Sequence, residues 1–243
     1  MRQMSGFGVA KNETKKRILD LVFPPRCAVC DGLLSLGEKG ICSSCKGKLP
    51  LVEEPRCFGC GKTVENSETE YCRDCRRKRH LFLQGFPLCH YIPPISDAMA
   101  LLKYHGRAEY ADFYGRMLAE TFGDTWKRLG IRVLAPVPVH GKRLRERGYN
   151  QAELLADAIS EATGIPVDTS LIIRSSETVA QKKLSREERS LNLRNAFQPG
   201  KNTPPDTVLV VDDIYTTGAT ADACAGVLLR AGAKKVYVTT VCC

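Results

Sequence analysis

The sequence predicts an α/β fold: a parallel sheet flanked by helices, preceded by a small cysteine-rich domain. From Ile131 to Val241, apolar segments of strand length alternate with amphipathic helical segments, which is typical of parallel sheets with helices on both faces. Eight of the 12 cysteines fall in four C-x-x-C pairs before residue 76. We therefore divide the 243 residues into a tail with a short helix (1–23), a cysteine-rich domain (24–79) and the α/β domain (80–243).

The individual elements follow from apolar periodicity and from the turn residues between them. A short helix at Asn12–Val22 ends before Pro24-Pro25, and Leu81–Ile92 contains the first strands. The later helices are Ser96–Tyr104, with Ser96 as N-cap, Ala108–Leu129, Asn150–Ala162 and Thr220–Ala231. The later strands are Ile131–Val137, Val167–Ile173, Val208–Val211 and Val236–Val241.

The cysteine pairs form two sets with one spacing: C-x2-C, eleven residues, C-x2-C. Each C-x2-C turn places two thiolates on one side, and two turns supply the four sulfurs of a tetrahedral Zn²⁺ site with Zn–S of about 2.3 Å. Four thiolates fill the coordination sphere, so we expect two structural zinc ions in a double zinc ribbon. The ligands of the first zinc are Cys27, Cys30, Cys42 and Cys45, and those of the second are Cys57, Cys60, Cys72 and Cys75.

The same cysteines leave alternatives open. A cross-braced arrangement would pair the first turn with the third and the second with the fourth, although the sequential arrangement costs less loop entropy. Iron–sulfur clusters and redox-active pairs use the same motif, but no β-α-β pattern surrounds it here. Cys89 and Cys224 lie outside the pattern, and we expect both to be small buried hydrophobic residues.

The formal net charge is +9, and most of the excess lies in the N-terminal part. Residues 1–95 hold 16 basic and 10 acidic side chains, and the remainder holds 20 and 17. The dense run Arg76–Arg79 predicts either attraction to phosphate groups or a solvated basic face. No run of 18 apolar residues predicts a membrane span, and the first ten residues lack the apolar core of a secretory signal, so we expect a cytoplasmic protein.

The segment Val208–Thr220 carries the strongest functional signal. An apolar strand leads into two acids, a loop of small hydroxylated residues follows, and then a helix begins. A helix N-terminus offers free N–H groups and partial positive charge, so this loop is suited to a phosphate group. The candidate binding residues are Asp212, Asp213, Thr216, Thr217, Gly218, Ala219 and Thr220.

Two acids beside a phosphate cradle need an explanation, because carboxylates repel phosphate. Ribose hydroxyls that donate hydrogen bonds to Asp212 and Asp213 would explain the two acids, as would support for Mg²⁺ or for a positively charged sugar. The alternative is a helix cap and turn that binds no ligand.

This segment resembles the motif with which type I phosphoribosyltransferases bind 5-phosphoribosyl-1-pyrophosphate (PRPP) and Mg²⁺. From Leu19 to Val241, the chain resembles the ComF family of ComFC/GntX-like competence proteins. The resemblance rests on the cysteine turns, Leu102-Lys103-Tyr104 with Gly106, Pro136-Val137-Pro138, Arg147–Gln151 and Gln181–Phe197.

The resemblance implies roles for further residues. Asp212 and Asp213 would be catalytic, and the loop Val139–Gly148 would bind pyrophosphate through Lys142, Arg143 and Arg147. A solvated basic loop is the alternative. Ser175–Arg194 would form a mobile hood over the active site, with Thr178, Gln181, Arg189 and Asn192 at the positions that match the family.

Three functions are compatible with these features. The first is a glycosyltransferase that transfers phosphoribosyl to a nitrogenous acceptor and releases pyrophosphate. The second is a competence factor that binds single-stranded DNA and other competence proteins, with Arg76–Arg79, Phe58 and Tyr71 as candidate DNA contacts. The third is a PRPP-binding regulator without turnover. No residue run identifies the acceptor or the oligomeric state.

Overall fold

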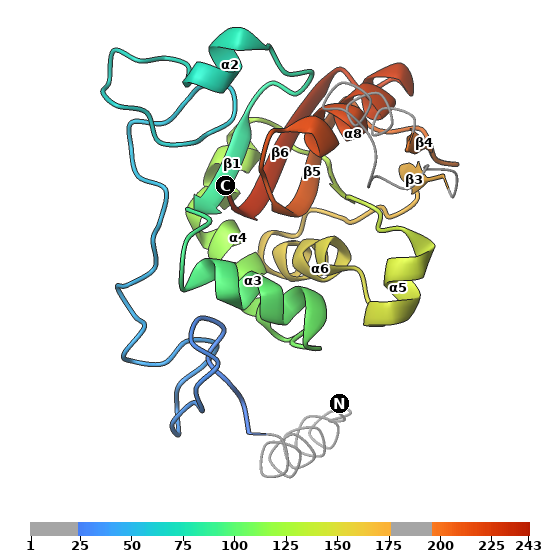
Figure 1. Ribbon diagram of the computed structural model, residues 1–243. Helices are drawn as coiled ribbons and strands as arrows, with labels where there is room; N and C mark the ends of the chain where they lie inside the picture. Colours follow the sequence, from blue (N-terminus) through green and yellow to red (C-terminus); the bar gives the residue numbers. More distant parts are fainter. Residues whose placement is uncertain (1–23, 176–195) are drawn as a thin grey trace, which may run out of the picture.

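A computed structural model describes residues 24–175 and 196–243 (Figure 1). The expected helix Asn12–Val22 lies outside these residues. So do nearly all of the expected hood and its four family positions, Thr178, Gln181, Arg189 and Asn192.

Four parallel strands form the central sheet, which confirms the predicted α/β class. Their order is β1 (Gly85–Cys89), β6 (Lys235–Cys242), β5 (Thr207–Ile214) and β2 (Val133–Pro136). A separate antiparallel pair joins β3 (Ile172–Arg174) to β4 (Phe197–Pro199). Strands β5 and β2 run side by side, with Val211 opposite Pro136.

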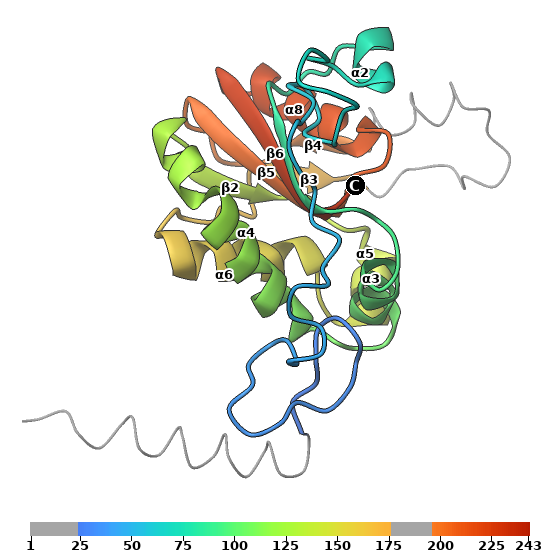
Figure 2. The same cartoon turned by 90° about the vertical axis from the view of Figure 1, so that its left-hand side faces the viewer.

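Helices cover both faces of the sheet, as Figure 2 shows. One face packs against α3 (Ile95–Tyr104), α4 (Tyr110–Arg128) and α6 (Gln151–Thr163), and the other against α8 (Ala219–Arg230) with β3 and β4. Successive strand residues point to opposite faces, so Leu209 and Val211 join the first core while Val208 and Val210 join the second. A strand buried on both faces must be apolar throughout, which explains the unbroken apolar run of β5.

Several expectations about element limits were wrong. The Val139–Gly148 segment is not a plain loop, because Gly141–Arg147 forms helix α5. Strand β5 continues through both acids to Ile214. Residue Val167 makes a single bridge to Leu134 rather than starting a long strand. Helix α3 begins at Ile95, so Ser96 lies inside its first turn and does not cap it.

The two zinc ribbons pack on different parts of the α/β domain. The first lies against α4, where the Tyr114 hydroxyl donates to the Ala28 carbonyl at 2.8 Å and the Tyr110 hydroxyl donates to Asp31. The second, which includes the short helix α2 (Arg73–Arg77), lies at the opposite end of the molecule in Figure 1. Across the two described stretches of chain, no helix combines the length and the apolar character needed to cross a membrane.

Candidate functional site

The cysteine sulfurs gather into two sets of four, and within each set all sulfurs lie within 4.8 Å of one another. Four sulfurs at about 2.3 Å from a tetrahedral zinc are separated by roughly 3.8 Å. The distance from Cys30 Sγ to Cys42 Sγ is 3.8 Å, and that from Cys60 Sγ to Cys72 Sγ is 3.6 Å. Both sets therefore fit structural Zn²⁺. Their members are Cys27, Cys30, Cys42 and Cys45, and Cys57, Cys60, Cys72 and Cys75, which is the sequential grouping.

The two ribbons repeat the same backbone contacts. The Cys42 N–H points to Cys27 Sγ at 3.4 Å, and at the equivalent place the Cys72 N–H points to Cys57 Sγ at 3.2 Å. Donors of this kind favour the thiolate form, which is the form that binds zinc.

Elemental analysis can test the grouping. With Cys27, Cys30, Cys42 and Cys45 all changed to serine, we expect the zinc content to fall from two to one per chain, because the second set keeps all four ligands. A cross-braced protein would lose two ligands from each site in the same variant. Zinc near zero in this variant, with two per chain in the unaltered protein, would contradict the sequential sites.

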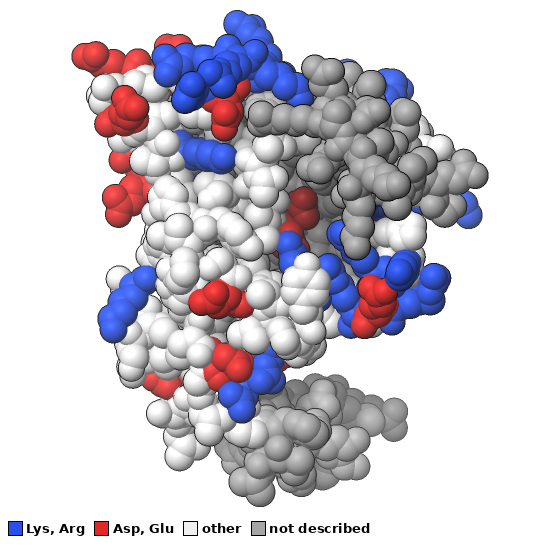
Figure 3. All heavy atoms as spheres, in the orientation of Figure 1, with Lys and Arg blue, Asp and Glu red and all other residues white. Residues whose placement is uncertain are grey.

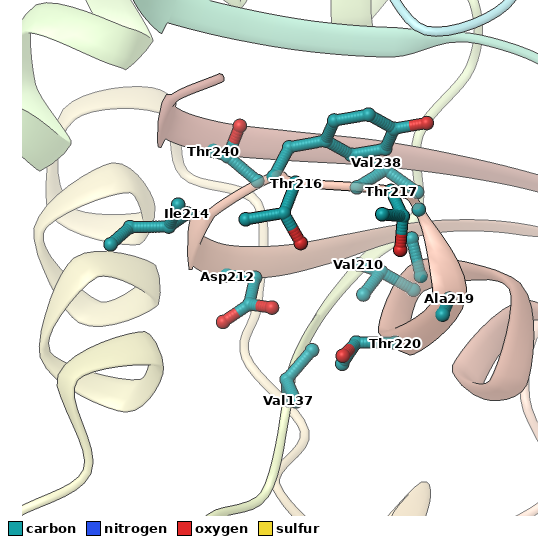
Figure 4. A pocket seen from close by; sticks show the side chains of 13 residues that line it. Val137, Val210, Asp212, Ile214, Thr216, Thr217, Ala219, Thr220, Val238 and Thr240 are labelled. Carbon is teal, nitrogen blue, oxygen red and sulfur yellow. The ribbon is translucent and has the colours of Figure 1, made fainter. Parts of the chain in front are cut away.

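A pocket of about 80 Å³ lies between the end of β5 and the start of α8 (Figure 4). One water needs about 10–15 Å³, so the pocket admits a group the size of a phosphoryl. In Figure 4, the carboxylate of Asp212 and the side chains of Thr216, Thr217 and Thr220 surround one space. Its lining residues include Val137, Asp212, Tyr215, Thr216, Thr217, Gly218, Ala219, Thr220 and Thr240.

The N-terminus of α8 faces this pocket. Gly218 is its N-cap, with φ of 76°, and among the described residues no side chain caps the helix there. The first N–H groups of a helix have no partner within the helix, so those of α8 are available to a bound anion. Three threonine hydroxyls next to them add neutral donors.

The two acids point in different directions. Asp212 lines the pocket, whereas Asp213 lies on the opposite side of β5 and pairs with Lys103 of α3 at 3.0 Å. The sequence prediction placed both acids on one ligand, but alternation along a strand separates adjacent side chains. Burial, followed by the negative charge of Asp213, raises the pKa of Asp212 to about 7. Asp212 is therefore held in unfavourable surroundings for its charged form, a feature common at functional sites.

This chain is similar to known proteins over most of its length. A family model described as "Double zinc ribbon domain" matches residues 18–76. The chain is 31% identical over 225 residues to "DNA utilization protein YhgH" of Escherichia coli K12, which covers 91% of this chain and 98% of that protein. It is 29% identical over 223 residues to "Competence protein F" of Haemophilus influenzae, covering 88% and 94%. The chain belongs to the ComF family. A third ComF relative, "Competence protein ComFC" of Bacillus subtilis, is 29% identical over 227 residues, covering 85% and 89%.

In this ComF chain, the residues expected to bind pyrophosphate lie on α5. Lys142, Arg143 and Arg147 are not among the residues that line the β5–α8 pocket. The Arg147 guanidinium lies over the ring of Tyr104 at 5.0 Å and also donates to Gln151 at 3.0 Å. Figure 3 shows basic side chains gathered over α5 and over α2.

Two cations near the ComF site were not predicted from the sequence. Arg174, at the end of β3, is buried enough that its pKa is lowered, first by burial and then by the charge of Arg143, while Asp212 acts in the opposite direction. Lys62 of the second ribbon donates to the Thr216 carbonyl at 3.1 Å. The only sequence signal for Arg174 is its place directly after an apolar strand. The sequence gives no signal for Lys62, because it lies 154 residues from its partner Thr216.

Proposed function

We propose that this protein binds PRPP with Mg²⁺ at the β5–α8 pocket and transfers its 5-phosphoribosyl group to a nitrogenous acceptor. One observation carries the proposal: strand β5 brings an acid to a pocket that is also lined by the hydroxyls of Thr216, Thr217 and Thr220 and by a helix N-terminus. This is the pairing of acceptors and donors that a sugar phosphate requires, because its hydroxyls donate to carboxylates and its phosphate accepts from N–H and O–H groups.

Within this proposal, different residues bind different parts of the ligand. Thr216–Thr220 and the start of α8 hold the 5′-phosphate, and Asp212 accepts from the ribose hydroxyls. Mg²⁺ fits the same place, since it is bound by one or two carboxylates together with substrate phosphates. When bound it would offset the negative charge of the leaving group.

The cations beyond Asp212 suit the pyrophosphate. Arg143 is close enough to Arg174 to lower its pKa, and Asp212 acts on Arg174 from the pocket side. In the reaction, the acceptor nitrogen donates its lone pair to C1 of the ribose, the C1–O bond breaks, and the bonding electrons leave with pyrophosphate. Guanidinium groups stabilise that developing charge.

Calorimetry with PRPP and Mg²⁺ tests the binding site. We expect Asp212→Asn to weaken binding at least about tenfold, because a hydrogen bond to a charged group contributes about 1.5–3 kcal/mol. The matched control is Asp206→Asn, an exposed acid just before β5 that pairs with Lys234 at 2.9 Å. An unchanged dissociation constant in the Asp212 variant would remove this acid from the site.

Release of pyrophosphate tests turnover separately. Incubation of the protein with labelled PRPP, Mg²⁺ and a panel of nitrogenous acceptors is expected to yield pyrophosphate with at least one acceptor. Binding without release on any acceptor would instead support a PRPP-binding regulator.

A second candidate function, nucleic-acid binding, is favoured by a cavity of about 390 Å³ beside the second ribbon. Arg76 and Arg79 line it together with Tyr71, whose ring lies edge-on to Phe58 at 6.2 Å. Both rings are exposed, at 42% and 57%. Cations beside exposed aromatic rings are how proteins bind single-stranded DNA, and other competence proteins are further candidate partners of a ComF protein.

Binding of single-stranded DNA at several salt concentrations tests this candidate. Changing Arg76, Arg77 and Arg79 to alanine is expected to weaken binding and to reduce the slope of log affinity against log salt by roughly two, since each lost phosphate contact removes about 0.7. The control removes three exposed cations that do not line the cavity, Lys127, Arg128 and Arg132. Equal losses in both variants would show general charge attraction and no site.

A further inference from the structure

The second ribbon reaches the loop between β5 and α8 (residues 215–218, the phosphate loop) through Lys62. Its ammonium group donates to the Thr216 carbonyl at 3.1 Å and lies 5.3 Å from the centre of the Tyr215 ring. The residue is half-buried, and its hydrogen bond to the loop is exposed to solvent. A cation from the cysteine-rich segment thus contacts the loop that lines the β5–α8 pocket, although Lys62 itself is not one of the lining residues.

The loop itself has no cation. Between Asp212 and Thr220 the sequence contains two acids and neither lysine nor arginine. A sugar 5′-phosphate carries close to two negative charges at neutral pH, and a helix N-terminus offsets only about half a charge. Asp212 adds a further negative charge at the same pocket. Lys62 is positioned to supply the charge that the loop lacks.

The ribbon fold does not need a lysine at this place. The Lys62 carbonyl accepts from the Cys57 N–H at 2.8 Å, and in the first ribbon the Gly32 carbonyl accepts from the Cys27 N–H at the same distance. Glycine therefore fulfils the same backbone role in the repeat. The cysteine turn therefore does not require the Lys62 side chain. What distinguishes Lys62 from Gly32 is its contact with the phosphate loop.

A zinc ligand helps to fix the place from which Lys62 projects, because the Cys57 N–H donates to the Lys62 carbonyl. The preceding residue, Gly61, packs so closely on β1 that an added Cβ would lie 2.2 Å from the Gly85 carbonyl oxygen. The lysine is thus anchored by a zinc ligand on one side and by the central sheet on the other.

His80, directly after the ribbon, supports the loop from behind. Its Nδ1 lies 3.1 Å from both carboxylate oxygens of Asp222, and its Nε2 lies 3.0 Å from the Tyr215 hydroxyl. The ring is buried and stacks on Phe82 at 4.6 Å. A Cβ added at Gly218 would lie 2.7 Å from His80 Cε1, so the imidazole packs directly against the loop backbone.

From these contacts we propose that the second zinc ribbon completes the phosphate site: Lys62 binds the 5′-phosphate of the ligand, and His80 positions the loop. Zinc at the second ribbon and ligand at the pocket are then linked, because a ligand held by Lys62 stabilises the ribbon conformation that presents it. Among the described contacts, the first ribbon packs on α4 instead and has no comparable link to the loop. The inference rests on the proposed sugar-phosphate site.

Calorimetry with three probes tests the role of Lys62. We expect Lys62→Met to weaken binding of PRPP with Mg²⁺ and of ribose 5-phosphate roughly tenfold, and to leave binding of pyrophosphate within about twofold. Lys62→Arg should restore most of the loss, which a change in packing alone would not do. The matched control is Lys46→Met, an exposed lysine of the first ribbon.

The outcomes separate this inference from the proposed function. If the unaltered protein binds neither PRPP nor ribose 5-phosphate, the proposed function fails. If it binds both and Lys62→Met binds them equally well, only the role of the ribbon fails. Equal weakening for all three probes would also overturn it, because Lys62 would then not act on the 5′-phosphate.

Zinc release gives an independent measurement. In the variant whose first ribbon carries four serines, the remaining zinc belongs to the second ribbon. Saturating ribose 5-phosphate is expected to slow its transfer to a coloured chelator several-fold, and adding Lys62→Met should abolish the effect. Equal release rates with and without ribose 5-phosphate would contradict the linkage. If the serine variant does not fold, the slower release phase is sought in the unaltered protein, with Lys62→Met as its comparison.

Discussion

Gly218→Ala is expected to lower PRPP affinity by about a hundredfold and to destabilise the protein by roughly 2–5 kcal/mol. The residue has φ of 76°, and an added Cβ would lie 2.5 Å from the Tyr215 hydroxyl and 2.7 Å from His80 Cε1. The left-handed backbone costs an alanine about 1–2 kcal/mol, and overpacking a well-filled site adds about 1–3 kcal/mol. The strain falls on the loop that would hold the phosphate, so we expect both stability and binding to be reduced.

Gly130→Ala is the matched control. Gly130 has φ of 71°, but nothing lies within 4 Å of its added Cβ. We expect the free energy of unfolding of this variant, measured with denaturant, to fall only by the backbone cost of about 1–2 kcal/mol. Its PRPP affinity, measured by calorimetry, should not change. If both variants lost the same stability and neither lost affinity, Tyr215 and His80 would not support the loop.

Asp212→Asn is expected to stabilise the ligand-free protein while weakening PRPP binding at least about tenfold. Burial and the adjacent charge of Asp213 raise the pKa of Asp212 to about 7, well above the ordinary value near 3.9. Between these two values the unfolded chain binds fewer protons than the folded one, so the stability of the unaltered protein falls as pH rises. The neutral amide lacks this penalty. Its stability advantage should therefore grow from pH 4 to pH 7 and then stay constant, as measured by denaturant unfolding.

Asp222→Asn should change the stability of the protein in the opposite direction. Burial raises the pKa of Asp222, but hydrogen bonds from His80, Lys78 and the Leu81 N–H outweigh it and lower the pKa overall. The carboxylate thus contributes stability at neutral pH, and that contribution is lost as pH falls below the ordinary carboxyl range. Removing the charge from Asp222 therefore destabilises the protein at pH 7 and has a smaller effect on stability near pH 3. If both variants changed stability in the same direction at pH 7, the two carboxyl groups would not lie in opposite electrostatic environments.

The sheet could be predicted because its strands are short, apolar and separated by helices with a clear period. The limits were less predictable. The apolar run of β5 ends at Val211, yet pairing of Asp212 with Thr240 and of Ile214 with Cys242 extends the strand beyond it. That extension depends on β6, which a local pattern does not include. Helix α5 has no buried residue, so it has no apolar stripe from which to predict it.

The candidate site was predictable where its parts are adjacent in the chain. Asp212 and Thr216–Thr220 belong to one strand, loop and helix, and the structure brings them to one pocket. The direction of Asp213 was missed because the strand was expected to end before it, and only a continuing strand requires alternation. Lys62 meets the loop across 154 positions, a contact set by the folding of the ribbon onto the sheet.

Strand β1 has a consequence for the order of assembly during translation. It forms an edge of the sheet, and its neighbour in that sheet is β6, Lys235–Cys242, which comes much later in the sequence. A ribosome must therefore synthesise the chain through β6 before Gly85–Cys89 can join the sheet. A nascent chain halted before Lys235 leaves this edge without its neighbour, whereas β2 and β5 already have each other.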